Sequence, residues 1–163
     1  MKYIFLGLGG NQGEILSQLI KCNEFIEKQI GRIVQQSSFY KTKAWGKTNQ
    51  PDFINSVIKV ETSLNPSQIL KQIETIEKLF GRDRTIQKKW EQRTMDIDLL
   101  FFEKKIIHTK NLIVPHPYLQ ERNFVLAPFV EIASEFVHPV FNKTILELHQ
   151  QNRDSLKVEK LNV

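Results

Sequence analysis

The stretch Met-Asp-Ile-Asp-Leu-Leu-Phe-Phe, residues 95–102, decides the fold. Its apolar residues predict a β-strand, with Glu103–Lys105 as a hairpin turn and Ile106–Ile107 as the returning strand. Side chains alternate along a strand, so Asp96 and Asp98 are expected on one face of the sheet. Two carboxylates this close repel each other and lose hydration in an apolar strand unless a cation or a donor compensates. The stretch therefore predicts a strand that carries a cation-dependent site.

Further strands and helices are expected on both sides of this strand. Apolar runs and alternation predict strands at Tyr3–Leu8, Ile33–Tyr40 and Phe53–Thr62. Spacings of three and four residues predict one helix from Ile15 to a stop near Gly31, and another that opens at Asn65-Pro66-Ser67 and ends at Gly81. Loops are expected at residues 41–52 and 82–93, and prolines 115, 117 and 128 are expected to break the following region into loop and short helix.

The order β-α-β-β-α-β predicts the fold class α+β. We expect a two-layer, ferredoxin-like sandwich in which helices cover one sheet face, with extra C-terminal elements around an apolar run at residues 145–148. The chain has 163 residues, of which 40% are hydrophobic and 11 are Phe, enough for a core. It has no internal repeat or low-complexity linker, so residues 1–163 are expected to form one domain.

The composition narrows the class of protein. A net charge of +5 attracts anions, but charge alone does not distinguish a nucleic acid, a nucleotide and a solvated surface. Cys22 is the only cysteine, which excludes an intramolecular disulfide and a zinc-thiolate cluster and fits a reducing compartment. The N-terminal apolar run is too short for a signal peptide or a membrane span, so we expect a cytoplasmic protein without a membrane partner.

The carboxylate pair and the residues before it favour phosphate chemistry. Magnesium takes few carboxylates together with water or phosphate oxygens, and Asp96 and Asp98 suit that task. The alternative is a strand edge whose polar face meets solvent or arginine. Five cations lie just upstream, and guanidinium groups bind phosphoryl oxygens in a bidentate way, although such a loop on its own is more often only solvated. These cations are Arg82, Arg84, Lys88, Lys89 and Arg93.

Other motifs are weaker. The glycine turn at residues 7–13 lacks the Lys-Ser/Thr ending of a P-loop and is more typical of a tight structural turn. His116 lies in a rigid Pro-His-Pro segment and without a second histidine at metal-ligand spacing, so a packed hydrogen-bonding role is favoured over zinc. The sequence contains no Gly-x-Ser-x-Gly motif and its one cysteine lies in a helix pattern, which favours direct transfer over a covalent intermediate.

Several motifs, in their order and spacing over almost the whole chain, resemble those of the hydroxymethyldihydropterin pyrophosphokinases. They are Leu8–Asn11, Ser37–Thr42, Gln50–Asn55, Glu77, Gly81–Arg82, Arg84, Arg93–Asp98, Val114–His116 and Arg122–Phe124. The resemblance implies an ATP-dependent enzyme of folate biosynthesis. It would transfer the pyrophosphoryl group of ATP to 6-hydroxymethyl-7,8-dihydropterin and release AMP and the pterin diphosphate. The partners it implies are these two small molecules, without nucleic acid, and the chain is expected to be a monomer.

The resemblance also implies roles for individual residues. Asp96 and Asp98 are expected to hold two Mg²⁺ ions, and Arg82 and Arg93 to stabilise phosphoryl charge as further catalytic residues. The expected nucleotide-binding residues are Glu77, Arg84, Trp90, Leu99, His116, Tyr118 and Arg122. The expected pterin-binding residues are Thr42, Lys43, Trp45, Phe53, Asn55, Asp96 and Phe124. Phe53 and Phe124 would sandwich the ring, and the Asn55 amide would face its pyrimidine edge. Without the resemblance, both phenylalanines would be assigned to the core.

The sequence departs from the family pattern at four positions. Glu91 and Gln92 replace an expected Gly and a small residue or Pro, which adds a negative charge near a triphosphate and restricts the backbone. Gly10 replaces a serine, and Lys43 replaces a proline. Two other functions fit part of the pattern. A basic βαββαβ sheet with aromatics also describes RNA-recognition modules, and an Asp pair could serve a metal-dependent phosphohydrolase, for which no water-positioning group was found.

Overall fold

The fold, given by a computed structural model that describes residues 1–43, 50–81 and 95–163, is built on a six-stranded antiparallel sheet. Its strands are β1 (Lys2–Gly10), β2 (Arg32–Gln36), β3 (Tyr40–Thr42), β4 (Phe53–Thr62), β5 (Asp96–Phe102) and β8 (Val158–Lys160). Their order is β5-β1-β4-β3-β8, and β2 pairs with β4 beside β3. The order β5-β1-β4-β2 is that of an antiparallel βαββαβ unit. This confirms the predicted fold class.

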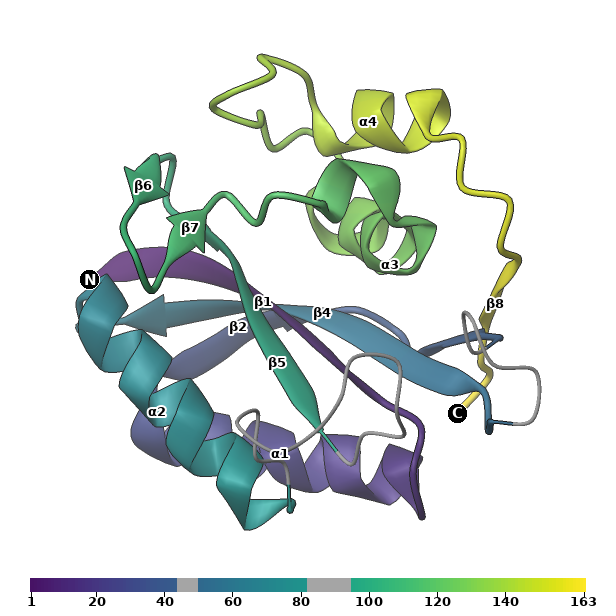
Figure 1. Cartoon of the computed structure of the whole chain (residues 1–163), viewed down its shortest axis with the longest axis horizontal. Coiled ribbons are helices and arrows are strands. Elements are labelled where there is room, and N and C mark those ends of the chain that lie inside the picture. The colour runs from purple at the N-terminus through teal and green to yellow at the C-terminus, as the bar shows by residue number, and fades with distance from the viewer. Residues whose placement is uncertain (44–49, 82–94) are drawn as a thin grey trace.

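Helices cover both faces of the sheet (Figure 1). Helices α1 (Ile15–Gln29) and α2 (Pro66–Leu79) lie on one face, while α3 (Asn123–Ala133) and α4 (Ile145–Gln151) lie on the other. The βαββαβ unit thus has its two helices on one face, as expected, and the C-terminal elements add a third layer. None of the helices within the described ranges is long and apolar enough to span a membrane.

Strand alternation divides the apolar residues into two cores. Ile4, Leu6 and Leu8 of β1 pack toward α1 and α2, whereas Phe5 points to the opposite face. There Phe5 meets Phe129 of α3 at a ring-centroid distance of 4.7 Å. Each fully buried residue of this size stabilises the fold by roughly 1.5–3 kcal/mol through hydrophobic transfer. The second core therefore fixes α3 against the sheet.

The helix ends follow from local chemistry. Asn65 caps α2 in a reciprocal capping box with Gln68, and Gly81 adopts φ 83° just after it, as the sequence predicts. Helix α1 also ends near Gly31, where glycine is needed for a steric reason. A Cβ atom on Gly31 would lie 2.1 Å from the backbone oxygen of Glu61 in β4. Glycine is therefore needed here for close approach of two backbones.

A β-bulge interrupts β5. Phe5 of β1 pairs with Phe101 and Leu6 pairs with Leu99, so Leu100 is the extra residue. Leu100 and Phe101 consequently both pack into the core below α3. The carbonyl oxygen of Leu100 accepts a hydrogen bond of 3.1 Å from the backbone N–H of His116. The bulge thus ties the His116 segment to the strand that carries the aspartates.

The predicted hairpin after β5 is wrong. Residues 103–104 form a turn, with Glu103 at φ 49°, but β6 (Ile107–His108) pairs with β7 (Ile113–Val114) in a separate sheet. One edge of β5 is already paired with β1. On its outer edge, the Glu77 carboxylate of α2 accepts a 2.8 Å hydrogen bond from Ile97 N–H. Nearer the turn, the Leu100 carbonyl accepts the His116 N–H, and a returning strand would have to replace this contact.

Two other boundaries differ from the prediction. The segment Ile33–Tyr40 is not one strand, because Ser37 separates β2 from β3 and its hydroxyl accepts a hydrogen bond from Val57 N–H at 2.9 Å. Pro128 does not break a helix but lies buried inside α3. Proline removes one helix hydrogen bond, and burial against the second core offsets that cost. Residues 44–49 and the whole of the expected loop 82–93 lie outside the described ranges.

Candidate active site

The strand register brings distant polar residues into rows across one face of the sheet. Asp96 of β5 pairs with Gly9 of β1, which pairs with Asn55 of β4. One row further along, Asp98 pairs with Gly7. Paired residues on antiparallel strands point to the same side, and this side faces α3. The prediction that both carboxylates share a face is confirmed.

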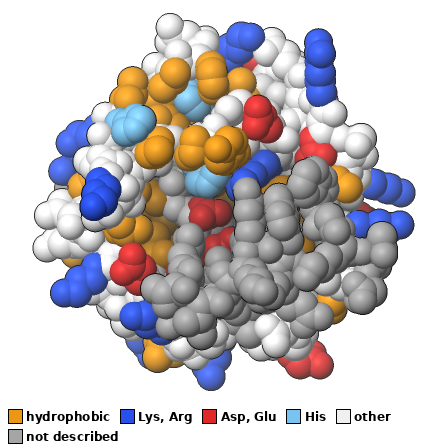
Figure 2. Space-filling view, viewed as in Figure 1, with side chains coloured by type: hydrophobic (Ala, Val, Ile, Leu, Met, Phe, Trp, Pro, Cys, Tyr) orange, Lys and Arg blue, Asp and Glu red, His pale blue; other side chains and the backbone are white. Residues whose placement is uncertain are grey.

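A cavity of ≈ 930 Å³ lies over these rows, between the sheet, α3 and the C-terminal segment. Acidic side chains lie recessed near the centre of the molecular face in Figure 2, below a band of hydrophobic and histidine side chains. The cavity is lined by most of the described residues that the family resemblance implies. These are Thr42, Lys43, Phe53, Asn55, Asp96, Asp98, Tyr118, Arg122 and Phe124.

The wall formed by β3 and β4 carries polar atoms that no described residue satisfies. Thr42 Oγ1 and Asn55 Oδ1 are buried, and each lacks a hydrogen-bond partner within the part of the chain that the structure describes. Asn55 Nδ2 donates to the carbonyl oxygen of Leu8 at 3.4 Å. Unsatisfied buried polar atoms are costly, so this wall is suited to a ligand that carries its own donors and acceptors.

Gly9 makes room for the Asn55 amide. A Cβ atom at position 9 would lie 2.1 Å from Asn55 Nδ2, too close for any real contact. Glycine at this position therefore allows the amide to lie flat over β1, next to Asp96. Part of the predicted glycine turn, residues 7–10, belongs to β1, and the absence of a side chain at Gly9 leaves space for the Asn55 amide in the cavity.

The aspartate pair fits a magnesium ion. Both side chains are partly exposed to the cavity, and the neighbouring strand presents only Gly9 and Gly7 opposite them. Among the described residues, no group of three or more His, Cys, Asp or Glu side chains is arranged to hold a metal. Magnesium prefers one or two carboxylates with water and phosphate oxygens in the remaining positions. A two-carboxylate site open to a cavity matches that preference.

Two expected nucleotide residues point away from the cavity. Glu77 is buried in α2 and its carboxylate accepts the Ile97 N–H at the edge of β5, between the two aspartates in sequence. Leu99 packs into the core against α1 and α2. Neither lines the cavity. Their direct roles toward the nucleotide stay predictions, and the observed contacts hold β5 in place.

The remaining described nucleotide residues lie together after β7. The backbone N–H of Tyr118 donates to His116 Nδ1 at 3.2 Å, which gives His116 the packed, hydrogen-bonded position expected of it. The Arg122 guanidinium lies 5.4 Å from the ring centre of Tyr118 and 5.8 Å from that of Phe124. Contacts of this kind stabilise by about 0.5–2 kcal/mol. They hold Arg122 beside the rings of Tyr118 and Phe124.

Cys22 is excluded as a nucleophile. The residue is buried in α1, and burial, followed by the nearby Glu77 charge, raises the pKa of its thiol to about 12. A thiol must ionise to act as a nucleophile. Its buried place in α1 agrees with the helix pattern in which the sequence placed it.

The chain matches the family model for 7,8-dihydro-6-hydroxymethylpterin-pyrophosphokinase (HPPK) over residues 5–134, most of its length. The chain belongs to this family. A 2-amino-4-hydroxy-6-hydroxymethyldihydropteridine pyrophosphokinase of Aquifex aeolicus is 40% identical over 152 residues, 93% of each chain. The Haemophilus influenzae protein of the same name is 38% identical over 159 residues, 97% of each chain. The predicted family and enzyme class are thus confirmed.

Solved HPPK structures share the fold. The Plasmodium falciparum HPPK-DHPS wild type with pterin and p-hydroxybenzoate has a TM-score of 0.75 at 19% identity, and the match covers 99% of this chain and 47% of that one. The wild type with pteroate has a TM-score of 0.73 at 19% identity, covering 92% and 42%. These matches add support to the ferredoxin-like assignment.

Five expected HPPK site residues lie outside the described ranges: Trp45, Arg82, Arg84, Trp90 and Arg93. Conversely, sequence reasoning missed one wall of the cavity, formed by Gln120, Glu121, Gln151, Asn152, Arg153, Asp154 and Leu156. No motif marks this wall. Its only sequence signal is a polar segment that follows the apolar run of α4.

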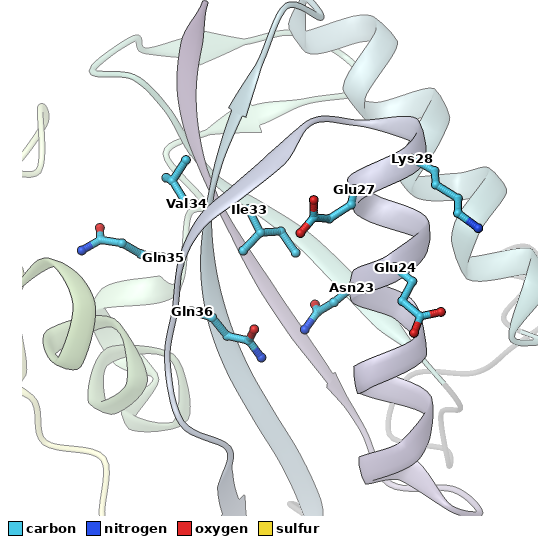
Figure 3. A pocket seen from close by; sticks show the side chains of 8 residues that line it. All are labelled: Asn23, Glu24, Glu27, Lys28, Ile33, Val34, Gln35 and Gln36. Carbon is cyan, nitrogen blue, oxygen red and sulfur yellow. The ribbon is translucent and has the colours of Figure 1, made fainter.

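A second cavity of ≈ 480 Å³ lies between α1 and β2 and is lined mainly by polar side chains (Figure 3). Ile33 and Glu27 point into it, whereas Val34 points to the other side of the sheet. Neither aspartate of the HPPK site lines it. The two cavities therefore belong to different parts of the fold.

Proposed function

We propose that this HPPK-family chain transfers the pyrophosphoryl group of ATP to the hydroxymethyl oxygen of 6-hydroxymethyl-7,8-dihydropterin, in folate biosynthesis. The observation that carries the proposal is one cavity that contains both the aspartate pair and the Thr42 and Asn55 oxygens, which no described residue satisfies. The carboxylates suit a metal-bound polyphosphate, while the amide suits the polar edge of a heterocycle. The register holds Asp96 and Asn55 on either side of Gly9.

In the proposed reaction, the pterin hydroxyl oxygen attacks the β-phosphorus of ATP, the bond from that phosphorus to the oxygen of the leaving AMP breaks, and the hydroxyl proton is released to water. Asp96 and Asp98 would hold two Mg²⁺ ions, whose charge would neutralise the phosphate oxygens. Phe53 and Phe124 sandwich the pterin ring and Asn55 orients its pyrimidine edge. Arg122 binds on the nucleotide side. Positioning of the two substrates supplies a large part of such catalysis.

Further roles follow from the family resemblance alone. We assign to Arg82 and Arg93 the stabilisation of phosphoryl charge. The residues assigned to nucleotide binding are Arg84, Trp90, His116 and Tyr118. Lys43 and Trp45 would complete the pterin side. We also propose that residues 1–163 act as a single-domain monomer in the cytoplasm.

Both faces of the sheet are covered by helices. An RNA-recognition module needs an exposed sheet face with stacking aromatics. The fold therefore does not favour the nucleic-acid alternative.

The test is to incubate the protein with ATP, Mg²⁺ and 6-hydroxymethyl-7,8-dihydropterin and to separate the nucleotides. Pterin-dependent AMP is expected. ADP, or phosphate release without pterin, would overturn the proposed reaction.

The metal role is tested with Asp98→Asn. Metal ions supply several kcal/mol of charge stabilisation, so we expect a loss of at least ~100-fold in AMP formation with an unchanged circular dichroism spectrum. Glu103→Gln is the matched control, because it removes one charge from the turn at the end of the same strand, outside the cavity. Retained activity in Asp98→Asn would refute the metal assignment.

A further inference from the structure

The C-terminal segment forms part of the cavity wall. After α4 the chain runs across the molecule to β8, shown in yellow in Figure 1. Asn152, Arg153, Asp154 and Leu156 all line the cavity. This segment lies beyond residue 134, where the family match ends.

Hydrogen bonds fix the segment in place. Asp154 Oδ2 accepts the backbone N–H of Asn123 at 3.1 Å, and Oδ1 accepts that of Leu156 at 3.0 Å. Asp154 N–H donates to Asn152 Oδ1 at 2.8 Å, and Asn152 Nδ2 donates to the carbonyl of Gln120 at 3.0 Å. Both oxygens of the Asp154 carboxylate are therefore used, one toward α3 and one within the segment.

The contact with Asn123 serves the start of α3. The first N–H groups of a helix have no partner within the helix, and a side-chain oxygen usually caps them. Arg122, at the N-cap position, provides no side-chain cap. Asp154 supplies an acceptor from another part of the chain, and its negative charge is favourable at a helix N-terminus.

Asn123 stands between two residues of the candidate site. Arg122 and Phe124 line the cavity and contact each other, so a bond to Asn123 N–H fixes the backbone from which both side chains extend. The far end of the segment is also anchored, because β8 pairs with β3, where Val158 lies opposite Thr42. The segment thus connects two walls of the cavity.

We propose that Asp154 is a positioning residue for the pyrophosphokinase reaction. By capping α3 it holds Arg122 and Phe124 toward the cavity, and so it acts on binding of both substrates. Asp96 and Asp98 lie on β5, whereas the carboxylate of Asp154 accepts hydrogen bonds from Asn123 and Leu156. Loss of the cap therefore raises KM for both substrates more than it lowers kcat. This inference rests on the proposed function.

The test compares Asp154→Ala and Asp154→Asn with the control Glu159→Gln, which removes one negative charge from β8 at a residue outside the cavity. For Asp154→Ala we expect both KM values to rise by about fivefold to tenfold and kcat to change less than about threefold. Asparagine keeps one acceptor oxygen, so Asp154→Asn is expected to give a smaller rise in KM. If the alanine variant does not fold, the asparagine variant carries the test.

Hydrogen exchange gives a readout that is independent of activity. Amides at residues 123–126 are expected to exchange faster in Asp154→Ala, by about tenfold, and at the wild-type rate in Glu159→Gln. Unchanged exchange would overturn the capping role. Faster exchange with wild-type KM values, or equal KM changes in the control, would overturn the positioning role. If the wild type forms no pterin-dependent AMP, the proposed function fails. The hydrogen-exchange result would still show whether Asp154 caps α3.

Discussion

Replacing Gly9 by alanine tests whether the glycine exists to make room for Asn55. The new Cβ atom would lie 2.1 Å from Asn55 Nδ2, while ordinary contact begins at 3.4 Å. The amide must therefore move by at least about 1.3 Å, the difference between these two distances. Because the obstructing atom is the end of a side chain, the fold can absorb the change at small cost.

The expected effect is on pterin binding. A displaced amide loses the two hydrogen bonds, one donated and one accepted, that we expect it to form with the pterin edge, each contributing about 0.5–1.5 kcal/mol. The loss of about 1–3 kcal/mol corresponds to a rise in pterin KM of roughly fivefold to 150-fold. The affinity for a non-hydrolysable ATP analogue, measured by calorimetry, is expected to stay within about twofold of wild type, because the proposed function assigns Asn55 to pterin binding.

A matched control and a double-mutant cycle sharpen the test. In Gly7→Ala the Cβ would meet Leu100 at 3.4 Å, an ordinary contact, so pterin KM is expected to change by less than about threefold. If Gly9→Ala acts through Asn55, adding it to Asn55→Ala should raise KM little further. Additive effects of the two substitutions would refute this reasoning.

Three further variants probe the fold. Gly31→Ala places a Cβ 2.1 Å from the backbone oxygen of Glu61, which belongs to a paired strand. Urea unfolding should therefore show a free energy of unfolding lower by at least ~2 kcal/mol, and wild-type stability would contradict the close approach. Tyr40→Phe removes the 2.7 Å hydrogen bond to the partly exposed Glu131 carboxylate, and the free energy of unfolding is expected to fall by about 1 kcal/mol in the same assay. Burial lowers the pKa of His138 from its usual 6.5. As the pH drops below 6.5, the histidine is therefore protonated in the unfolded chain before it is protonated in the folded one, and the free energy of unfolding falls. His138→Leu should weaken that pH dependence, and an unchanged pH profile of thermal unfolding would exclude the histidine as its source.

Local patterns predicted the parts of the fold that depend on local chemistry. Strand alternation placed Asp96 and Asp98 on one face, and β4 begins and ends at the predicted residues, Phe53 and Thr62. The Asn65-Pro66-Ser67 start of α2 was predicted because caps act within a single turn. In each case the interactions that decide the structure lie within a few residues along the chain.

The features that the sequence did not predict depend on contacts between distant segments. The hairpin after β5 was wrong because the backbone of His116, which lies beyond β7, occupies the strand edge at Leu100. Pro128 stands inside α3 because burial outweighs one lost hydrogen bond. The cap from Asp154 to Asn123 spans 31 positions in sequence and follows no motif. For the candidate site, the family resemblance supplied roles that periodicity alone leaves open, such as those of Phe53 and Phe124.

The bulge at Leu100 makes the length of β5 a condition for a working site. A bulge adds one residue to the strand. The residues before it therefore point to the opposite sheet faces from those they would take if the strand ran on to Phe101 and Phe102 without the bulge. Deleting one residue at the bulge while Phe101 and Phe102 keep their places would turn Asp96 and Asp98 toward the apolar layer of α1 and α2. Two carboxylates would then replace Ile97 and Leu99 in that core. Homologues of this strand are therefore expected to tolerate substitutions at Leu100 far better than insertions or deletions of a single residue.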